Sequence, residues 1–185
     1  GETITGVSTF KLKHEIDTGN LLVQKSCAIL PEDNAGTLHD KLMHLGTDAI
    51  VETLEQVLNS ELKEIPQHES EEDKNAPKLH PANTELQWDR KGSDIVNFVR
   101  GLNPYPLAHC TFDHKKMKVY KASFYPEHHT NDIGSFVTDG KSYLGVWVTD
   151  GMVHLDEIKI EGKRQMKIKD FLNGYEISHL KIKEL

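Results

Sequence analysis

Cysteine is scarce in this 185-residue sequence, which contains only Cys27 and Cys110. No Cys-x-x-Cys pair occurs, and neither cysteine has partners at the spacing of a zinc site. These absences exclude a disulfide-stapled domain and a cysteine-ligated metal, so no metal is expected. We predict that both cysteines are buried, reduced side chains of a cytoplasmic protein.

Long apolar runs are also missing. The longest, such as 21–23 and 146–148, are only a few residues long, whereas a membrane helix needs about 20. We therefore expect no membrane partner. The chain begins Gly-Glu-Thr-Ile-Thr-Gly, without an initiator methionine and without the parts of a secretory signal. We expect it to be a fragment of a longer protein.

The motifs that bind nucleotide phosphates are absent as well. Neither Gly-x-Gly-x-x-Gly nor Gly-x-x-x-x-Gly-Lys occurs, and there is no Gly-x-Ser-x-Gly. Dinucleotide-dependent dehydrogenases, P-loop enzymes and serine hydrolases therefore have no local support.

Positive charge is outweighed, with 22 Lys+Arg against 29 Asp+Glu. A net charge of −7 argues against uniform nucleic-acid binding. The acidity is concentrated in residues 1–65, which carry 5 basic and 11 acidic residues. Residues 81–185 carry 15 basic and 14 acidic residues. Only local basic clusters in the second part can face nucleic acid.

The first third of the chain predicts a strand, a loop, a strand and a long helix. Segments 5–13 and 21–29 are rich in β-branched and apolar residues. From Leu38 to Leu58 apolar residues recur every three or four positions, which is typical of a helix. We predict Thr37 as its N-cap, paired with Asp40, and a break or kink at Gly46.

Residues 66–81 have the proline and polar content of a linker. Beyond them we predict a short helix capped at Ser93, with Trp88 as a core anchor, followed by several short strands. Asp139-Gly140 and Asp150-Gly151 predict hairpins. One helix followed by short strands favours a small β-barrel.

Asp17 is the first candidate for chemistry, because it lies in a predicted loop beside Thr18-Gly19. A carboxylate there can act as a general base, although a solvated turn explains the same residues. Gly162-Lys163-Arg164 forms a basic cluster that could meet phosphates or be a solvated charged surface. Arg100, on the polar side of the short helix, is a second candidate for phosphate contact.

Together these segments resemble the methionyl-tRNA formyltransferase family along nearly the whole chain. The resemblance is carried by the following segments: Thr5-Gly6-Val7, Ile16-Asp17-Thr18-Gly19, Leu38 to Leu42, Leu45-Gly46, Pro66-Gln67, Lys78-Leu79, Trp88, Arg100 to Pro106, Lys118 to Ala122, Asp150-Gly151, Gly162 to Met166 and Asp170-Phe171-Leu172. No single motif decides the match, but their order and spacing are specific.

The resemblance implies a fold and a division of the chain. The fold is an α/β remnant of a Rossmann-like formyltransferase domain followed by a small β-barrel, OB-like, C-terminal domain. The domains are 1–65 for the end of the catalytic domain, 66–81 for the linker and 82–185 for the barrel. The expected state is a monomer.

The resemblance also implies a reaction, in which formyl passes from 10-formyltetrahydrofolate to methionyl initiator tRNA. Asp17 falls on the catalytic Asp of the family. Glu15, Ile16 and Asp17 are the expected folate-binding residues. The expected tRNA-binding residues are Lys78, Arg100, Lys163 and Arg164. The family's Asn-x-His and Ser-Leu-Leu-Pro do not occur in this chain, so we expect the chain alone to be inactive.

Two alternatives stay open. A sugar-nucleotide formyltransferase, or the folate-hydrolase domain of formyltetrahydrofolate dehydrogenase, would share the Asp-Thr-Gly loop and use another acceptor. A noncatalytic RNA-binding module would use only the barrel.

Overall fold

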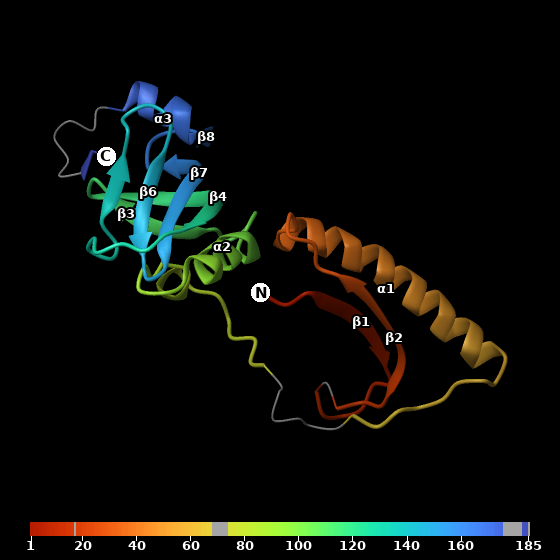
Figure 1. Cartoon of the computed structure of the whole chain (residues 1–185). Helices are drawn as coiled ribbons and strands as arrows, with labels where there is room; N and C mark the ends of the chain where they lie inside the picture. The colour runs from red at the N-terminus through yellow and green to blue at the C-terminus, as the bar shows by residue number, and fades with distance from the viewer. Residues whose placement is uncertain (17, 68–73, 176–182, 185) are drawn as a thin grey trace. The chain divides into compact units, whose positions relative to one another are not determined.

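The computed structural model describes residues 1–16, 18–67, 74–175 and 183–184. The chain divides into two compact units, Glu2–Lys78 and Leu79–Leu185, and the second unit also includes Gly1. Figure 1 shows the elements of both. The domain boundaries expected from the sequence stay a prediction.

The N-terminal unit is a two-stranded antiparallel sheet with one long helix against it. Strand β1 (Ile4–Phe10) pairs with β2 (Leu21–Ala28), and helix α1 (Ala35–Leu58) packs on both strands. Strand β1 is shorter than the sequence predicts, because the chain leaves the ladder after Phe10. Lys25 of β2 pairs with Glu52 of α1 at 2.7 Å, and this hydrogen bond raises the pKa of Lys25.

The start of α1 differs from the prediction. Its N-cap is Asn34, whose side chain accepts a hydrogen bond from the Thr37 backbone N–H at 3.0 Å. The Thr37 hydroxyl in turn accepts from the Asn34 backbone N–H at 3.0 Å, which completes a capping box. Thr37 is therefore the third residue of the helix, and the predicted cap of Thr37 with Asp40 is wrong. Asn is among the most favourable N-cap residues, so the physical preference is satisfied three positions earlier.

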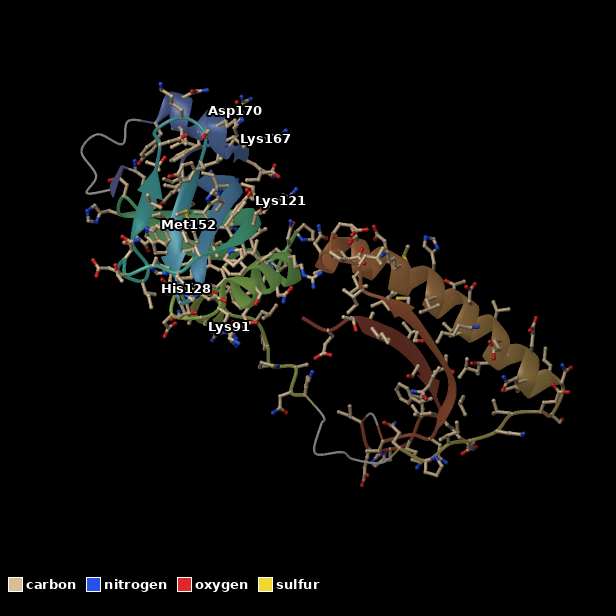
Figure 2. The ribbon with its side chains drawn as sticks, viewed as in Figure 1. Lys91, Lys121, His128, Met152, Lys167 and Asp170 are labelled. Atoms are coloured by element: carbon tan, nitrogen blue, oxygen red, sulfur yellow. The ribbon has the colours of Figure 1, made fainter. Side chains whose placement is uncertain are left out.

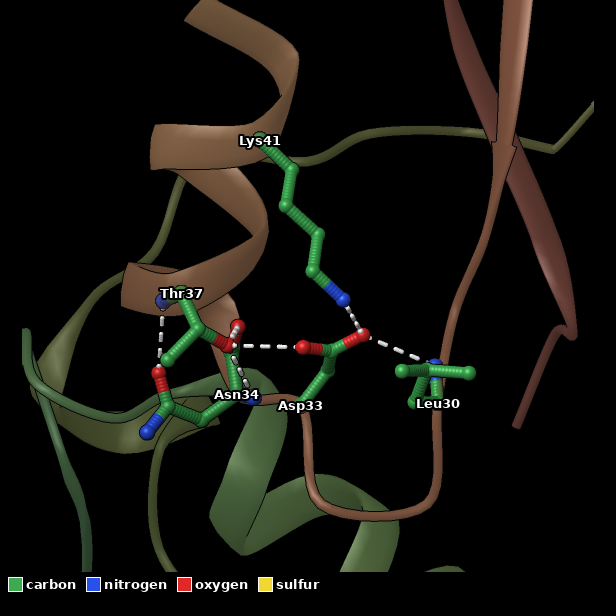
Figure 3. A network of polar contacts seen from close by, with 5 residues as sticks. All are labelled: Leu30, Asp33, Asn34, Thr37 and Lys41. Atoms are coloured by element: carbon green, nitrogen blue, oxygen red, sulfur yellow. Dashed lines mark hydrogen bonds and ion pairs between the residues drawn. The ribbon is translucent and has the colours of Figure 1, made fainter.

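Asp33 anchors the same helix start (Figure 3). Its carboxylate, only 5% exposed, accepts hydrogen bonds from the Leu30 backbone N–H at 2.8 Å, Thr37 Oγ1 at 3.1 Å and Lys41 Nζ at 2.6 Å. The Lys41 ammonium holds the pKa of Asp33 below its ordinary value, with the Leu30 amide adding to the effect. This network ties the β2–α1 connection to the first two turns of the helix.

Gly46 does not break α1, which runs without interruption from Ala35 to Leu58. The predicted kink is therefore wrong. The cost of one glycine, about 1 kcal/mol, is offset by packing of the helix on the sheet, where Ala49 is fully buried.

The C-terminal unit combines two α-helices and a 3₁₀ turn with a curled, mostly antiparallel sheet (Figure 1). Its elements are the 3₁₀ turn η1 (Pro81–Asn83), α2 (Gly92–Gly101), β3 (Ala108–Phe112), β4 (Lys115–Pro126), β5 (Phe136–Thr138), β6 (Leu144–Val148), β7 (Gly151–Ile160), β8 (Met166–Lys167), α3 (Ile168–Gly174) and β9 (Lys183–Glu184).

The strands follow the order β3-β4-β7-β6-β5-β9, and β8 pairs with β7 beside this path. All neighbours are antiparallel except β5 and β9, which are parallel. Helix α2 packs against β4 and β7. Between the strands that the structure describes, no ladder joins β3 to β9, so the sheet is a half-barrel.

One hydrophobic core lies inside this curl. It is built by residues of the strands together with one face of α2 and of α3. Buried side chains alternate with more exposed ones along β3 and the first half of β4, whereas every residue of β6 is buried. The fully buried members of the core include Ile95, Val99, Met117, Val119, Leu144, Val146, Val148, Leu155, Ile158, Ile160 and Phe171. Trp88 packs against this core but is half-buried, and its ring makes an edge-to-face contact with Phe136 at a centroid distance of 6.3 Å. Val137, Trp147 and Met152 form a second, smaller cluster, of which Figure 2 labels Met152.

The predicted hairpins are confirmed. Val148 pairs with Gly151 around the turn Thr149-Asp150, and Thr138 pairs with Leu144 around a loop that contains Asp139 and Gly140. The predicted cap of α2 at Ser93 is wrong. The N-cap is Lys91, which makes no side-chain cap, and the Gly92 N–H donates instead to Asp150 Oδ1 at 2.8 Å.

The two cysteines are free thiols with different surroundings. Cys110 is buried, and burial raises the pKa of its thiol to about 12. Cys27 is half-buried, so the prediction of two buried cysteines holds only for Cys110. Along β2, Cys27 is in phase with the buried Val23 and with Lys25, and it is the last partly covered residue of the strand.

None of the helices in the described part of the chain combines the length and the apolar character needed to cross a lipid bilayer.

Candidate functional site

The loop between β1 and β2 carries the first group of predicted site residues. Glu15 and Ile16 are both exposed, and Ile16 presents 88% of its surface to solvent. Thr18 Oγ1 donates to the Glu15 carbonyl at 3.2 Å, which folds the loop over a short turn. Asp17, the predicted catalytic residue, lies outside the described residues.

The base of this loop is closed by a tight backbone approach. The Lys11 N–H donates to the Asn20 carbonyl at 2.9 Å. At Gly19 a Cβ atom would lie 1.7 Å from the Lys11 carbonyl oxygen. Only glycine therefore fits at this position, which gives the Gly of the Asp-Thr-Gly segment a structural role.

Glu64 and Gln67, far from the loop in sequence, form hydrogen bonds with residues at its base. Glu64 accepts hydrogen bonds from Lys11 Nζ at 2.7 Å and from Asn20 Nδ2 at 2.8 Å. The Lys11 ammonium, helped by the Asn20 amide, lowers the pKa of Glu64. Gln67 Nε2 donates to the Gly19 carbonyl at 2.5 Å. The loop is thus held at its base, while Glu15 and Ile16 are exposed to solvent.

Sequence reasoning missed both Glu64 and Asn20 as anchors of the loop. No local signal connects them, because the two residues are 44 positions apart and meet only through side-chain geometry. Leu21 and Ile65 exchange backbone hydrogen bonds at 2.8 Å, and this pairing brings Glu64 to the loop.

The second group of predicted site residues is dispersed. Lys163 and Arg164 lie together in the turn between β7 and β8, where they line a groove of about 220 Å³ with α3 residues Asp170 and Phe171. Arg100 lies on α2 instead, and its Nε donates to Asn97 Oδ1 at 2.8 Å. Lys78 is an exposed residue of the extended segment before η1.

Sequence reasoning also missed a basic row on the outer surface of the sheet. His109 of β3 is paired directly with Lys118 of β4, and Lys118 is paired directly with Lys159 of β7. Their chain neighbours Cys110, Met117 and Ile158 point into the core, so the three basic side chains point outward. The alternation of Lys116 and Lys118 with apolar residues is a signal that could have found part of this row.

A groove of about 250 Å³ follows the row. It is lined by Lys116, Lys118, Lys159, Ile160 and Glu161. Three ammonium groups around one carboxylate make it electropositive. The arrangement can bind an anion, but it contains no nucleophile or base positioned for bond making.

Metal binding finds no support in the described parts of the chain, where no three His, Cys, Asp or Glu side chains gather as they would around an ion.

Comparison with known proteins agrees with this division into two units. The family described as "Formyl transferase, C-terminal domain" matches residues 78–176, and "Formyl transferase" matches residues 1–54. Methionyl-tRNA formyltransferases of Phocaeicola vulgatus and Parabacteroides distasonis are 38% and 40% identical over 96% and 95% of this chain. The chain spans 58% and 57% of the length of these relatives.

Among solved structures, HypX from Aquifex aeolicus in complex with tetrahydrofolic acid matches with a TM-score of 0.65. The match covers 100% of this chain and 32% of HypX at 18% identity, so it supports the fold alone. Because the C-terminal family matches more than half of the residues and the N-terminal family matches the unit before it, this chain belongs to the formyl transferase family.

Proposed function

We propose that this chain is part of a methionyl-tRNA formyltransferase, which transfers formyl from 10-formyltetrahydrofolate to the α-amino group of methionyl initiator tRNA. The observation that carries the proposal is the 38–40% identity to methionyl-tRNA formyltransferases along almost the whole chain. The braced β1–β2 loop supports it, because a loop that is rigid at its base can present Asp17 to a substrate.

The chemistry assigned to Asp17 is that of a general base. The methionyl nitrogen attacks the formyl carbon, the bond between that carbon and N10 of the folate breaks, and tetrahydrofolate leaves. The amine must lose a proton as it attacks, and the Asp17 carboxylate takes that proton and passes it to N10 of the leaving tetrahydrofolate. Glu15 and Ile16, exposed beside it, are proposed to face the folate.

The C-terminal unit is proposed to bind the tRNA. Its half-barrel is proposed to be of the OB-like type, a fold that binds oligonucleotides on its sheet and loops. Lys163 and Arg164 share one groove and can meet one or two phosphates together. Arg100 and Lys78 are proposed as further contacts with the tRNA. The enzyme is proposed to be located in the cytoplasm.

The test of the enzymatic proposal uses a chimera, in which the residues that precede the matched region of the Phocaeicola vulgatus relative are joined to this chain. We expect the chimera to formylate methionyl initiator tRNA, and we expect the 185-residue chain alone to be inactive. Asp17→Asn should lower kcat by about 10²–10⁴-fold, the usual contribution of a general base. Glu32→Gln, at an exposed carboxylate of the same unit, is the control and should leave kcat unchanged.

The acceptor is tested in the same assay. Formylation of an amino-sugar nucleotide in preference to methionyl-tRNA would assign the chain to the sugar-nucleotide enzymes. Formyl transfer by the isolated chain would contradict the proposed inactivity.

Lys78 has its own test. If its ammonium contacts a phosphate, Lys78→Ala lowers the affinity for initiator tRNA and reduces the slope of log K against log[salt] by about one. Titrations of labelled tRNA at several KCl concentrations measure that slope. An unchanged slope removes Lys78 from the tRNA contacts.

A further inference from the structure

We propose that Glu64 is a positioning residue for the formyl transfer reaction, because its carboxylate clamps together the two ends of the loop that carries Asp17. The inference rests on the proposed function, which assigns the general base of the reaction to this loop. In this role Glu64 acts through the loop and not on the reacting atoms.

The clamp joins the first and the last residue of the loop. Strand β1 ends at Phe10 and β2 begins at Leu21, so Lys11 and Asn20 are the two ends of the connection. Glu64 Oε1 accepts a hydrogen bond from Lys11 Nζ at 2.7 Å, and Oε2 accepts one from Asn20 Nδ2 at 2.8 Å. One carboxylate therefore holds both ends of the loop, each with a different oxygen.

This arrangement needs a carboxylate rather than an amide. The Lys11 ammonium and the Asn20 Nδ2 group can only donate hydrogen bonds. The hydrogen bonds from Lys11 and Asn20 lower the pKa of Glu64, so both of its oxygens are acceptors near neutral pH. Glu64→Gln would replace one acceptor with an NH₂ donor. Turning the Asn20 amide over to receive that donor would give up the hydrogen bond from Lys13 Nζ to Asn20 Oδ1, which is 3.3 Å long.

Backbone pairing fixes Glu64 beside the ends of the loop. Leu21 and Ile65 exchange two backbone hydrogen bonds of 2.8 Å, which form an isolated antiparallel bridge. On the other side of Ile65 in the sequence, Gln67 Nε2 donates to the Gly19 carbonyl at 2.5 Å. The carboxylate is therefore presented from a backbone that is itself held in place, as accurate positioning requires.

The clamp adds little to the stability of the fold. The Lys11 and Glu64 side chains are 61% and 33% exposed, and ion pairs with such access to water stabilise a protein only weakly. The N-terminal unit is held together by the β1–β2 ladder and by the packing of α1 on both strands. Loss of the clamp should therefore loosen the loop without unfolding the unit.

A looser loop has a direct consequence for the reaction. A general base must lie within hydrogen-bond reach of the proton that it takes, and a displacement of about 1 Å can lower the rate by about 100-fold. Glu15 and Ile16, in the middle of the loop, are exposed to solvent. The position of this part of the loop therefore depends on how the two ends are held.

The test of activity uses the chimera of this chain with the N-terminal part of the Phocaeicola vulgatus relative. Glu64→Gln should lower kcat by about 10- to 100-fold. It should leave the KM for methionyl-tRNA unchanged, because it disturbs the reacting group and not the binding of the tRNA. Glu61→Gln removes an exposed carboxylate from the same segment and is the control, with kcat and KM unchanged.

A double-mutant cycle separates positioning from a general defect of the fold. In the Asp17→Asn background, Glu64→Gln should hardly lower kcat further, because a residue that acts through Asp17 loses its effect once that carboxylate is gone. A general defect would lower kcat by the same factor in both backgrounds. That result would overturn the proposal, as would an unchanged kcat in Glu64→Gln or an equal loss of kcat in Glu61→Gln.

The clamp is also measured without activity, on the 185-residue chain. The Lys11 amide donates to the Asn20 carbonyl at 2.9 Å, so its hydrogen exchange, followed by NMR, reports opening of the loop at its base. This exchange should be severalfold faster in Glu64→Gln than in Glu61→Gln or the unaltered chain, with the Tm and the other amides of β1 and β2 unchanged.

The exchange measurement also keeps the two proposals apart. Unchanged exchange at Lys11, or faster exchange along both strands, overturns the clamp whatever the chimera does. Faster exchange at Lys11 together with a chimera that transfers no formyl would instead contradict the proposed function and leave the clamp standing.

Discussion

His154 is the residue whose surroundings make the clearest prediction about stability. Its ring lies between Tyr125 and Tyr143, at centroid distances of 4.3 Å and 4.8 Å. Burial lowers the pKa of His154 below its ordinary value of 6.5, and this effect exceeds the opposing attraction of Asp156 and Asp139. The folded state therefore keeps this imidazole neutral where the unfolded chain would protonate it.

The sign of the pH effect follows directly. As pH falls below about 6.5 the unfolded state binds more protons than the folded state, so the free energy of unfolding decreases. His109 contributes in the same direction, since its pKa is also lowered by burial. In His154→Gln we expect a smaller loss of Tm between about pH 7.5 and about pH 5.5 than in the unaltered chain. His128→Gln, at an exposed position, should show the full loss, and equal losses in all three proteins would contradict the prediction.

At the residue scale, sequence reasoning identified some of the candidate site. The basic pair Lys163 and Arg164 could be found because the residues are adjacent in the chain, and they share a groove. The Glu64 anchor and the Lys118–Lys159 pair could not, because both depend on contacts between distant positions.

The sequence predicted the residue range of helix α1 well, but it predicted the burial of its side chains poorly. Its apolar period predicts a helix, and the helix runs over the expected residues. Of the apolar positions behind that period, however, only Ala49 is fully buried, while Ile50, Leu54 and Val57 are at least half exposed. A period of 3.6 establishes that a helix forms, but it does not establish what covers each side of it.

Gly46 lets this element be tested. No heavy atom lies within 4 Å of the place where a Cβ would be added, and the residue is in the middle of a continuous helix. Gly46→Ala should raise the free energy of unfolding of the N-terminal unit by about 0.5–1 kcal/mol. Far-UV circular dichroism in urea measures the change.

Gly151→Ala is the matched contrast. Its φ of +153° and a contact of 2.2 Å between the added Cβ and the Tyr125 carbonyl oxygen leave no room for a side chain. This substitution should lower stability by more than about 1 kcal/mol. A destabilised Gly46→Ala variant would show that α1 has a kink in solution.

At the scale of the whole molecule, the aromatic residues allow the two units to be observed separately. Both tryptophans and all five tyrosines belong to positions after 79. The compact unit Leu79–Leu185 contains the large hydrophobic core. We therefore expect residues 79–185, expressed alone, to unfold cooperatively in urea, because one large core joins the helices and most strands of the unit and supports two-state behaviour. Tryptophan fluorescence and near-UV circular dichroism follow the transition, and a gradual change without a midpoint would contradict the prediction.

The sequence by itself determined the order of most elements, the hairpins at Asp139-Gly140 and Asp150-Gly151, and the family resemblance. These features depend on local turn chemistry, periodicity and the order of short motifs, all of which are written along the chain. The tertiary structure alone decided that Asn34 caps α1, that Asp150 accepts from the start of α2, and that Glu64 braces the β1–β2 loop.

The basic row is the clearest case of that second kind. In the sheet, β4 lies between β3 and β7. Lys118 and Lys159 become neighbours only because β4 pairs with β7 and not with β5, the next strand in the sequence. Strand register then places both ammonium groups on the outer surface, since a shift of one residue would turn them into the core. Composition could show that residues 81–185 are nearly neutral, but only the pairing of the strands could gather their positive charge on one surface.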